Sequence, residues 1–201
     1  LLVCKLKFFH LYYCFFFLLE IIDGDPRNEF FIGKDNGNII LSKVLDRELC
    51  NIYNLTISVT DGFSTVYTTV QVNVVDTNDN RPMFSDNIYN LNISENIEEE
   101  STIMQLYASD KDENSVIFYT LHSAEDPTSL ALFRVDSVNG NLLTTQRLDY
   151  EKSAKHVLIV SAKDQGTPTK NNFAKIIINV HDHNDHAPEF TNKIIECKVL
   201  E

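Results

Sequence analysis

The sequence has few of the residues that mark several common classes of protein. It contains no tryptophan and only four cysteines in 201 residues. The cysteines, at positions 4, 14, 50 and 197, do not have the spacing of metal ligands, and two of them lie in an unusual amino-terminal segment. They predict neither a zinc module nor a disulfide framework. The sequence also has no nucleophile elbow and no glycine-rich phosphate loop, so it gives no support to a hydrolase or a nucleotide-binding enzyme.

Basic residues are scarce as well. Lysine and arginine total 17 against 29 acidic residues, which gives a net charge of −12. This balance argues against nucleic acid as a partner, because its phosphates need a basic face, whereas an acidic surface suits cations. Hydrophobic residues make up 43% of the chain, enough for a folded core, and the length fits one large domain or two of about 100 residues. The first residue is Leu rather than Met, so we expect a fragment of a longer protein.

Residues 1–20 differ in composition from the rest of the chain. Lys5 and Lys7 precede a run from Phe8 to Leu19 that is made almost entirely of Phe, Leu and Tyr. A basic start followed by an apolar run is typical of a signal peptide, but a small-residue cleavage site is absent, and the run is too short to span a membrane comfortably. The favoured interpretation is an artefact at the chain end that replaced the first strands of a domain, with a signal peptide as the alternative.

A segment rich in Asp and Asn occurs twice. Residues 76–84 read Asp-Thr-Asn-Asp-Asn-Arg-Pro-Met-Phe, and residues 182–190 read Asp-His-Asn-Asp-His-Ala-Pro-Glu-Phe. Side chains of this kind hydrogen-bond to nearby backbone and end strands and helices, and the proline keeps the exit extended. We therefore predict an oxygen-rich hinge after each of two folded units. Calcium prefers such a cluster, because its ligands are carboxylate, amide and main-chain oxygens.

Other motifs repeat at one constant spacing. Asn36-Gly37-Asn38 recurs as Asn139-Gly140-Asn141, Leu45-Asp46-Arg47-Glu48 as Leu148-Asp149-Tyr150-Glu151, and Asp61 as Asp164, each 103 residues later. The hinge copies are 106 residues apart, so three extra residues lie between Asp164 and Asp182, which we place in the turn at 166–168. Repetition at this period predicts two copies of one domain.

Within each copy the hydrophobic pattern has a period of two, as in strands with one buried face. The residues expected on these faces are Tyr53, Leu55, Ile57 and Val59; Val66, Thr68, Val70, Val72 and Val74; His156, Leu158, Val160 and Ala162; and Ala174, Ile176, Ile178 and Val180. Short runs of this kind separated by glycine-containing turns predict an all-β protein of tandem Greek-key β-sandwiches. We expect about seven strands in the second sandwich, starting near Tyr89. The first sandwich is expected to be truncated at its amino terminus, because its sequence matches the repeated pattern only from about residues 19–25.

Many acidic residues fall at the ends of the expected strands. Glu95 follows the strand that starts near Tyr89, Asp110 and Asp112 flank Lys111, and the pairs Asp46–Glu48 and Asp149–Glu151 have the same spacing. Alternate residues of an extended chain point the same way, so we predict that each pair can share one ion. Two carboxylates about 4 Å apart repel each other by roughly 4 kcal/mol at an effective dielectric of about 20. Bound cations explain a duplicated set of such pairs better than solvated loops do.

The combination of these motifs resembles tandem cadherin repeats. The matching segments are Leu-Asp-Arg-Glu, the two hinges, Ser94-Glu95-Asn96, Ala-Ser-Asp-Lys-Asp at 108–112 and Ser-Ala-Lys-Asp-Gln-Gly at 161–166, and the resemblance covers about residues 19–190. The second hinge is most similar to those of the giant Fat-type protocadherins. The resemblance implies an adhesion module rather than an enzyme, with calcium ions between consecutive repeats.

The resemblance also implies which residues bind calcium. Between the two repeats they are Asp46, Glu48, Asp76, Asn78, Asp79, Asp110, Asp112 and Asp164, together with the carbonyls of Thr77, Asn80 and Asn114. At a second junction, whose partner repeat would lie beyond Glu201, they are Glu95, Asp149, Glu151, Asp182, Asn184 and Asp185.

The implied domains are a leader at 1–20, a truncated repeat at 21–80, a complete repeat at 81–186 and the start of a further repeat at 187–201. The implied function is calcium-dependent, homophilic cell–cell adhesion, in which bound calcium stiffens the junctions and the partners are cadherin ectodomains on an apposed cell. The parent protein would be a single-pass protein of the plasma membrane with these repeats on its extracellular side. Sequons at Asn54 and Asn92, whose side chains the alternation points outward, predict glycosylation.

Other interpretations fit less well. The main alternative is a calcium-independent extracellular binding or scaffold sandwich. An EF-hand starting at Asp76 fails, because its sixth position is Arg81 and its twelfth is Asn87. A zinc site formed by His181, His183 and His186, with Cys197, lacks a tetrahedral ligand spacing. A pair of carboxylates for glycoside hydrolysis lacks a pocket that would raise one pKa.

Overall fold

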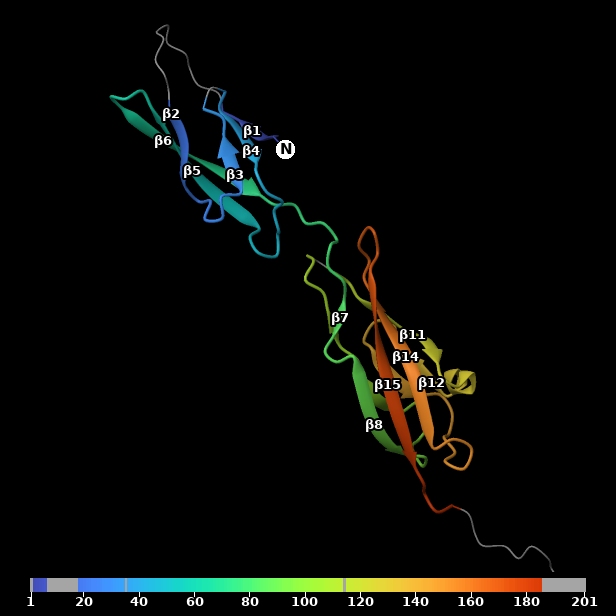
Figure 1. Cartoon of the computed structure of the whole chain (residues 1–201). Helices are drawn as coiled ribbons and strands as arrows, with labels where there is room; N and C mark the ends of the chain where they lie inside the picture. The colour runs from blue at the N-terminus through green and yellow to red at the C-terminus, as the bar shows by residue number, and fades with distance from the viewer. Residues whose placement is uncertain (1, 7–17, 35, 114, 186–201) are drawn as a thin grey trace, which may run out of the picture. The chain divides into compact units, whose positions relative to one another are not determined.

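The computed structural model describes residues 2–6, 18–34, 36–113 and 115–185. Backbone contacts divide the chain into two compact units, unit 1 (Leu1–Thr77) and unit 2 (Asn78–Glu201). Strands dominate both units (Figure 1), so the predicted all-β fold with one sandwich after another is confirmed. The domain limits predicted at 20, 80 and 186 stay a prediction; the division by contacts falls after Thr77.

Unit 1 consists of two three-stranded antiparallel sheets. One has the order β1 (Leu2–Lys5), β4 (Asn38–Leu41), β3 (Phe30–Ile32), and the other has the order β2 (Leu18–Asp23), β5 (Ile52–Thr60), β6 (Thr65–Asn73). The alternation in β5 is confirmed, because Tyr53, Leu55, Ile57 and Val59 are all buried in one core cluster. β6 is an edge strand in the described part of unit 1, and its apolar face is covered only in part, with Val66 64% exposed.

Part of the predicted leader belongs to a sheet of unit 1. β1 pairs with β4, and the backbone N–H of Leu6 donates to the carbonyl of Gly37 over 3.1 Å. Unit 2 has the same contact, in which Leu106 N–H donates to Gly140 O over 2.8 Å. β1 therefore takes the place beside β4 that β9 (Thr102–Gln105) takes beside β13 (Asn141–Thr144) in unit 2. Residues 7–17, which hold most of the apolar run, lie outside the described residues.

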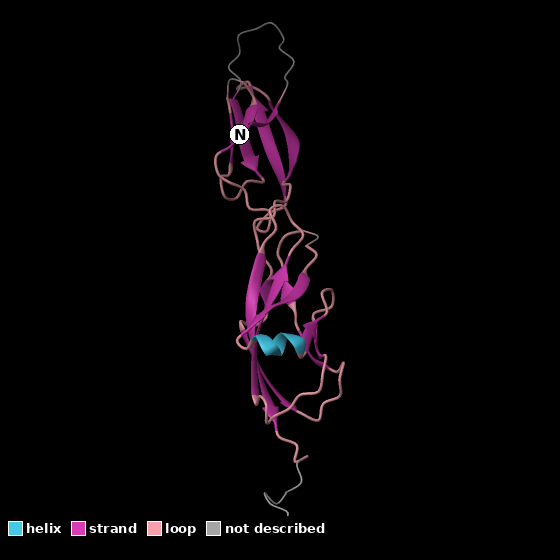
Figure 2. Cartoon of the chain, turned by 90° about the vertical axis from the view of Figure 1, so that its right-hand side faces the viewer, coloured by secondary structure: helices cyan, strands magenta, loops and turns pink. Residues whose placement is uncertain are grey.

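Unit 2 contains nine strands and one short 3-10 helix in its described residues (Figures 1 and 2). β7 (Met83–Phe84) pairs with β10 (Ala108–Ser109), and the other two sheets have the orders β11 (Phe118–Ala124), β14 (Lys155–Lys163), β15 (Asn171–His181), β8 (Ile88–Ser94) and β12 (Phe133–Val135), β13, β9. The sequence predicted about seven strands, because the two-residue strands β7 and β10 are too short to show a period. The helix is η1 (Pro127–Ala131), and the described residues hold no helix long and apolar enough to cross a membrane.

The pairing of β8 with β15 positions one end of unit 2. These two strands are parallel, with Lys175 opposite Ile88 and His181 opposite Ser94, whereas the other strand pairs of the unit are antiparallel. The first long strand and the last strand of the unit therefore end at the same edge. Glu95 directly follows β8, and its backbone N–H donates to the carbonyl of His181 over 3.1 Å.

The core of unit 2 confirms the predicted faces of β14 and β15. Leu158, Val160, Ala162, Ala174, Ile176, Ile178 and Val180 are buried in one cluster. The repeated Asn-Gly-Asn motif forms the turn before β4 and before β13. Gly37 and Gly140 have φ values of 64° and 72° there, a left-handed conformation that glycine adopts without the Cβ penalty of other residues. The need for this conformation explains why the motif recurs.

Candidate cation sites

Glu95 is held at the β8–β15 end of unit 2 with its carboxylate in a fixed position. Its side chain is only 7% exposed. Oε2 accepts a hydrogen bond from the backbone N–H of Tyr150 over 2.6 Å, and Oε1 accepts one from the backbone N–H of His183 over 2.6 Å. A buried carboxylate is costly unless it is hydrogen-bonded or paired, and these two bonds satisfy one lone pair on each oxygen. The remaining lone pairs are available to a cation.

Two further carboxylates lie beside Glu95. Glu151 and Asp185 each offer an oxygen that lies within 4.8 Å of the other two residues' ligand atoms. Glu151 follows Tyr150 in the loop between β13 and β14, and Asp185 follows β15, so three separate segments supply the cluster. Glu151 and Asp185 are exposed whereas Glu95 is buried. Three oxygen ligands of this kind, open on one side, fit a hard cation that completes its shell from elsewhere.

Asp46 and Asp149 have a structural role that the spacing argument did not include. Oδ1 of Asp149 accepts from Lys152 N–H over 2.9 Å, and Oδ1 of Asp46 accepts from Leu49 N–H over 3.1 Å. Both pairs, Asp46–Glu48 and Asp149–Glu151, thus lie where the chain turns, and the assumption of an extended chain was wrong for them. The turn is made by the Asp side chain, which satisfies a backbone donor as such residues commonly do.

Asp110 and Asp112 lie in the loop after β10, at the other end of unit 2. Asp112 is 7% exposed, and its carboxylate accepts from the Asn80 backbone N–H at 3.1 and 3.2 Å and from Asn80 Nδ2 at 2.7 Å. Asp112 N–H in turn donates to Asp110 Oδ1 over 3.1 Å, so here too the pair is in a turn rather than an extended chain. Asp110 Oδ2 is buried and has no hydrogen-bond partner among the described residues. A buried carboxylate oxygen without a donor is expected where a cation binds.

Asp164 anchors the hinge residue Asn78 to the loop between β14 and β15. Its Oδ1 accepts from the N–H groups of Lys170 and Gly166 at 2.9 and 3.0 Å, and its Oδ2 accepts from Asn78 Nδ2 at 3.2 Å. Burial raises the pKa of Asp164, but these hydrogen bonds and the charge of Lys170 outweigh it, so the pKa lies below its ordinary value. The carboxylate is therefore ionised at neutral pH. Asp61, its counterpart in unit 1, likewise accepts from the N–H groups of Phe63 and Ser64.

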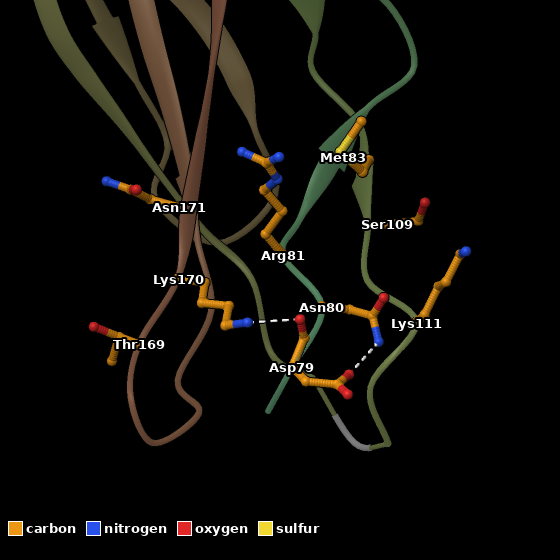
Figure 3. A pocket seen from close by; sticks show the side chains of 9 residues that line it. All are labelled: Asp79, Asn80, Arg81, Met83, Ser109, Lys111, Thr169, Lys170 and Asn171. Carbon is orange, nitrogen blue, oxygen red and sulfur yellow. Dashed lines mark hydrogen bonds between the residues drawn. The ribbon is translucent and has the colours of Figure 1, made fainter. Parts of the chain in front are cut away.

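Asp79 is exposed, and both its backbone carbonyl and its carboxylate accept hydrogen bonds from unit 2. The Nζ of Lys170 donates to the Asp79 carbonyl over 2.6 Å (Figure 3), while Asn80 Nδ2 donates to Asp79 Oδ1 over 2.8 Å. Together with the contacts of Asn78 to Asp164 and of Asn80 to Asp112, this fixes three consecutive hinge residues on unit 2. The carboxylate of Asp79 keeps acceptor capacity for a cation.

Two predicted ligands of unit 1, Glu48 and Asp76, lie near Arg47. Arg47 Nε lies 3.9 Å from Asp76 Oδ1, and Arg47 Nη1 lies 4.0 Å from Glu48 Oε1. Both carboxylates are half-buried. Arg47 therefore offsets part of the mutual repulsion of these two carboxylates.

The structure does not describe every predicted ligand. Asn114 lies outside the described residues, as do His186 and Cys197 of the zinc alternative. Thr77, Asp182 and Asn184 are described and exposed. The sequence did not reveal Lys170, which binds the Asp79 carbonyl, or the backbone donors of Tyr150 and His183. No local signal could have found them, because each meets its partner across more than 50 residues. The predicted glycosylation residues Asn54 and Asn92 are both exposed.

The fold and these sites together define a class of protein. Each unit is a β-sandwich, and the predicted ligand carboxylates lie on short loops at strand ends. Two copies of such a module, joined by an acidic hinge, define the class of tandem β-sandwich repeats. A comparison with known families identifies the class further. The family model of the cadherin domain matches residues 18–75 and 89–181, and the chain belongs to the cadherin family.

Individual relatives agree with this assignment. The chain is 62% identical over 182 residues to the Fat-like cadherin-related tumor suppressor homolog of Drosophila melanogaster and 44% identical over 182 residues to human Protocadherin Fat 1. Each match covers 90% of this chain but only 4% of the relative. A solved structure of the protocadherin gammaB7 EC3-6 cis-dimer superposes with a TM-score of 0.79 at 28% identity, over 90% of this chain and 44% of that one.

These similarities confirm the predicted resemblance to Fat-type cadherin repeats. The repeats of this family are modules of adhesion proteins and are not enzymes, so the prediction of a non-enzymatic chain is confirmed by the family assignment. The chain spans a small part of the length of the relatives that it matches, and what a whole relative does is carried over only as a proposal.

Proposed function

We propose that this chain is a calcium-binding part of an extracellular cadherin array that acts in calcium-dependent cell–cell adhesion, with other cadherin ectodomains as partners. The observation that carries the proposal is the Glu95–Glu151–Asp185 cluster, whose ligand atoms lie within 4.8 Å of one another. Without a counter-ion, three carboxylates at this distance repel strongly. The backbone N–H groups of Tyr150 and His183 hold the two carboxylate oxygens of Glu95 in place without a bound ion.

The chemistry of the sites favours calcium among the common cations. The predicted ligands are carboxylate, amide and main-chain oxygens, and hard cations prefer such ligands, whereas zinc prefers His and Cys. Calcium sites in extracellular modules have dissociation constants of roughly 0.1–1 mM, so ions would occupy such sites outside cells and leave them empty inside. The buried Asp110 Oδ2 without a donor supports the same assignment at the other end of unit 2.

The proposed role of calcium is mechanical. Predicted ligands occur on both sides of the division after Thr77: Asp46, Glu48 and Asp76 belong to unit 1, and Asp79, Asp110 and Asp112 to unit 2. An ion that takes ligands from both units would hold them in one orientation, and a stiff array can present an adhesive surface at a distance. We propose in addition homophilic recognition, glycosylation at Asn54 and Asn92, and a plasma-membrane parent protein with these repeats outside the cell.

Calcium titration of the whole chain by calorimetry tests the proposal. We expect binding in the range of about 0.1–1 mM, and the same titration of Glu95→Gln should lose the contribution of the cluster. Small-angle scattering supplies a mechanical readout, because calcium should change the maximum dimension of the wild type and have much less effect on Asp79→Ala. Heat exchange indistinguishable from buffer, with a maximum dimension that calcium leaves unchanged, would contradict the proposal.

The main alternative is a sandwich that binds its partner without calcium. Limited proteolysis separates the two. A calcium-stiffened array should be cut at residues 76–81 only after chelation, whereas a calcium-independent scaffold should be cut equally with and without chelator.

A further inference from the structure

Unit 2 has a cleft lined by basic side chains, which is unexpected in a chain with a net charge of −12. The cleft has a volume of about 750 Å³, and all of its lining residues belong to unit 2. They come from the end of the hinge and β7, from the segment around β10, and from the end of the β14–β15 loop with the first residue of β15 (Figure 3). The basic residues are Arg81, Lys111 and Lys170, against one acid, Asp79.

The three cations differ in how they are held. Lys170 is fixed, because its Nζ donates to the Asp79 carbonyl over 2.6 Å. Arg81 and Lys111 are exposed, and neither side chain makes a hydrogen bond or an ion pair with the described residues. Their donors therefore remain free to bind a ligand. An arginine with free donors binds sulfate and carboxylate groups through two parallel hydrogen bonds.

The rest of the lining indicates what kind of anion fits. Ser109, Thr169 and Asn171 offer hydroxyl and amide groups, which can hydrogen-bond to the hydroxyls of a sugar. The apolar contribution is a single side chain, Met83, which is 51% exposed. The buried centre of a protein–protein interface is usually formed by aromatic or other large apolar residues, and none lines this cleft.

We propose that this cleft binds a sulfated oligosaccharide of the glycosaminoglycan type, with Arg81 and Lys111 as the residues that contact its anionic groups. Such a chain carries both anionic groups and hydroxyls, and the lining offers both cations and neutral polar groups. Lys170 stays on the hinge carbonyl and contributes charge rather than a direct contact. Neither Arg81 nor Lys111 is a predicted calcium ligand, but the lining also includes two that are, Asp79 and Asn80.

The test is titration of the whole chain with a heparin hexasaccharide, followed by calorimetry and by backbone amide shifts. Arg81→Gln/Lys111→Gln is the test variant. Arg134→Gln/Lys155→Gln is the control, because it removes the same charge from two exposed residues of unit 2 outside the cleft. The test variant should lower the affinity at least about tenfold, the control less than about twofold, and the wild-type amides of Ser109 and Asn171 should shift. Affinity should also fall as sodium chloride rises.

Each other result overturns the proposal. The proposal is wrong if the wild type does not bind the heparin hexasaccharide, or if the control variant loses as much affinity as the test variant. It is also wrong if a desulfated hexasaccharide binds as tightly as the sulfated one, or if a hexaglutamate peptide binds more tightly. All titrations are run both with calcium and with EDTA, and the loss in the test variant is expected in both. Failure of the calcium proposal therefore leaves this test intact. Thermal melting of both variants checks that they fold like the wild type.

Discussion

The backbone N–H of His183 donates a 2.6 Å hydrogen bond to Oε1 of Glu95, 88 residues earlier in the chain. The second oxygen of the same carboxylate accepts from Tyr150 N–H, also at 2.6 Å. One buried side chain thus joins the end of β8, the loop before β14 and the segment after β15. Binding of a cation to Glu95 would therefore be linked to the position of the chain that leaves unit 2.

Glu95→Gln should weaken both the fold and the binding of calcium. The amide of Gln presents one oxygen and one NH₂, so one of the two backbone donors would face another donor and stay unsatisfied, at a cost of about 1–3 kcal/mol. The loss of one charged ligand should also lower calcium affinity at this cluster by tenfold or more. Urea unfolding in EDTA measures the first effect, and calorimetric titration measures the second.

Glu98→Gln is the matched control, because Glu98 is exposed and its side chain accepts no hydrogen bond in the described residues. It should leave both measurements near the wild-type values. If Glu95→Gln were as stable as this control in EDTA, the two short hydrogen bonds of Glu95 would not contribute to the fold.

Much of the fold could be predicted because its determinants are local. The Asn-Gly-Asn turns need a left-handed glycine, and Gly37 and Gly140 both supply it. Signals that involve only a few neighbouring residues are visible in the sequence, and so is the period of two in the hydrophobic pattern of the long strands.

The remaining features depend on partners that are distant in sequence. The Tyr53 hydroxyl donates to Glu29 over 2.6 Å inside unit 1, and burial together with this carboxylate raises the Tyr53 pKa. Nothing near Glu29 in the sequence distinguishes it from a solvated acid, although it is 5% exposed. The pairing of Leu2–Lys5 with β4 was missed for the same reason, because the composition of the segment suggested a leader. The carboxylates could be predicted as a set, but their turn geometry and the burial of Glu95 could not.

Asp164 should make the stability of unit 2 depend on acid pH. Its carboxylate pKa is lower in the folded protein than its ordinary value, because hydrogen bonds and Lys170 outweigh the effect of burial. The resulting stabilisation is fully present above the unfolded pKa of about 3.9 and is lost as pH falls through the lower, folded pKa. Urea unfolding in EDTA between about pH 6 and pH 2 should show this fall, and Asp164→Asn should reduce it.

Asp164→Ala separates the charge from the hydrogen bonds. It leaves the N–H groups of Lys170 and Gly166 without their acceptor, so it should cost about 1–3 kcal/mol even at neutral pH. Asp164→Asn keeps an acceptor oxygen and should cost less. Equal acid dependence in the wild type and in both variants would mean that other carboxylates govern the acid transition.

His156 should produce a second pH dependence, nearer to neutrality. It is 3% exposed, and its Nδ1 is 2.8 Å from Ser129 Oγ. Its ring makes a T-shaped contact with the ring of Phe133, with centroids 5.2 Å apart. Burial lowers the His156 pKa, and the nearby charge of Asp126 offsets this only in part. The unfolded state therefore binds a proton first as pH falls below about 6.5, and stability should decrease from there down to the folded pKa.

His156→Phe removes this titration while it keeps the aromatic contact. The variant should be less stable at pH 7.5 by about 1–3 kcal/mol, because Ser129 is fully buried and loses its partner. Its stability should nevertheless change less than that of the wild type between pH 7.5 and pH 5.5. Urea midpoints at the two pH values measure both effects, and an unchanged pH dependence would show that His156 does not titrate in this range.

Gly140 should tolerate no side chain, for two reasons that can be measured separately. Its φ of 72° is unfavourable for an L-residue, and a Cβ added there would lie 2.5 Å from the carbonyl oxygen of Leu106. Gly62 in unit 1 has a φ of 89°, but a Cβ there would meet nothing within 4 Å. Gly62→Ala should therefore cost only the backbone term, about 1–2 kcal/mol, while Gly140→Ala should cost at least about 3 kcal/mol.

Amide hydrogen exchange reports each unit of the whole chain on its own, so the two substitutions can be compared without assuming that the units unfold together. The Leu106 amide is the most direct reporter for Gly140→Ala, because it donates to the Gly140 carbonyl over 2.8 Å and a shift of the Leu106 backbone away from a new Cβ would stretch this bond. We expect faster exchange at Leu106 and along β9 and β13 in Gly140→Ala, and a smaller, uniform change along β5 in Gly62→Ala. Equal losses in the two variants would mean that the backbone conformation alone, and not the close approach of Leu106, requires glycine at this turn.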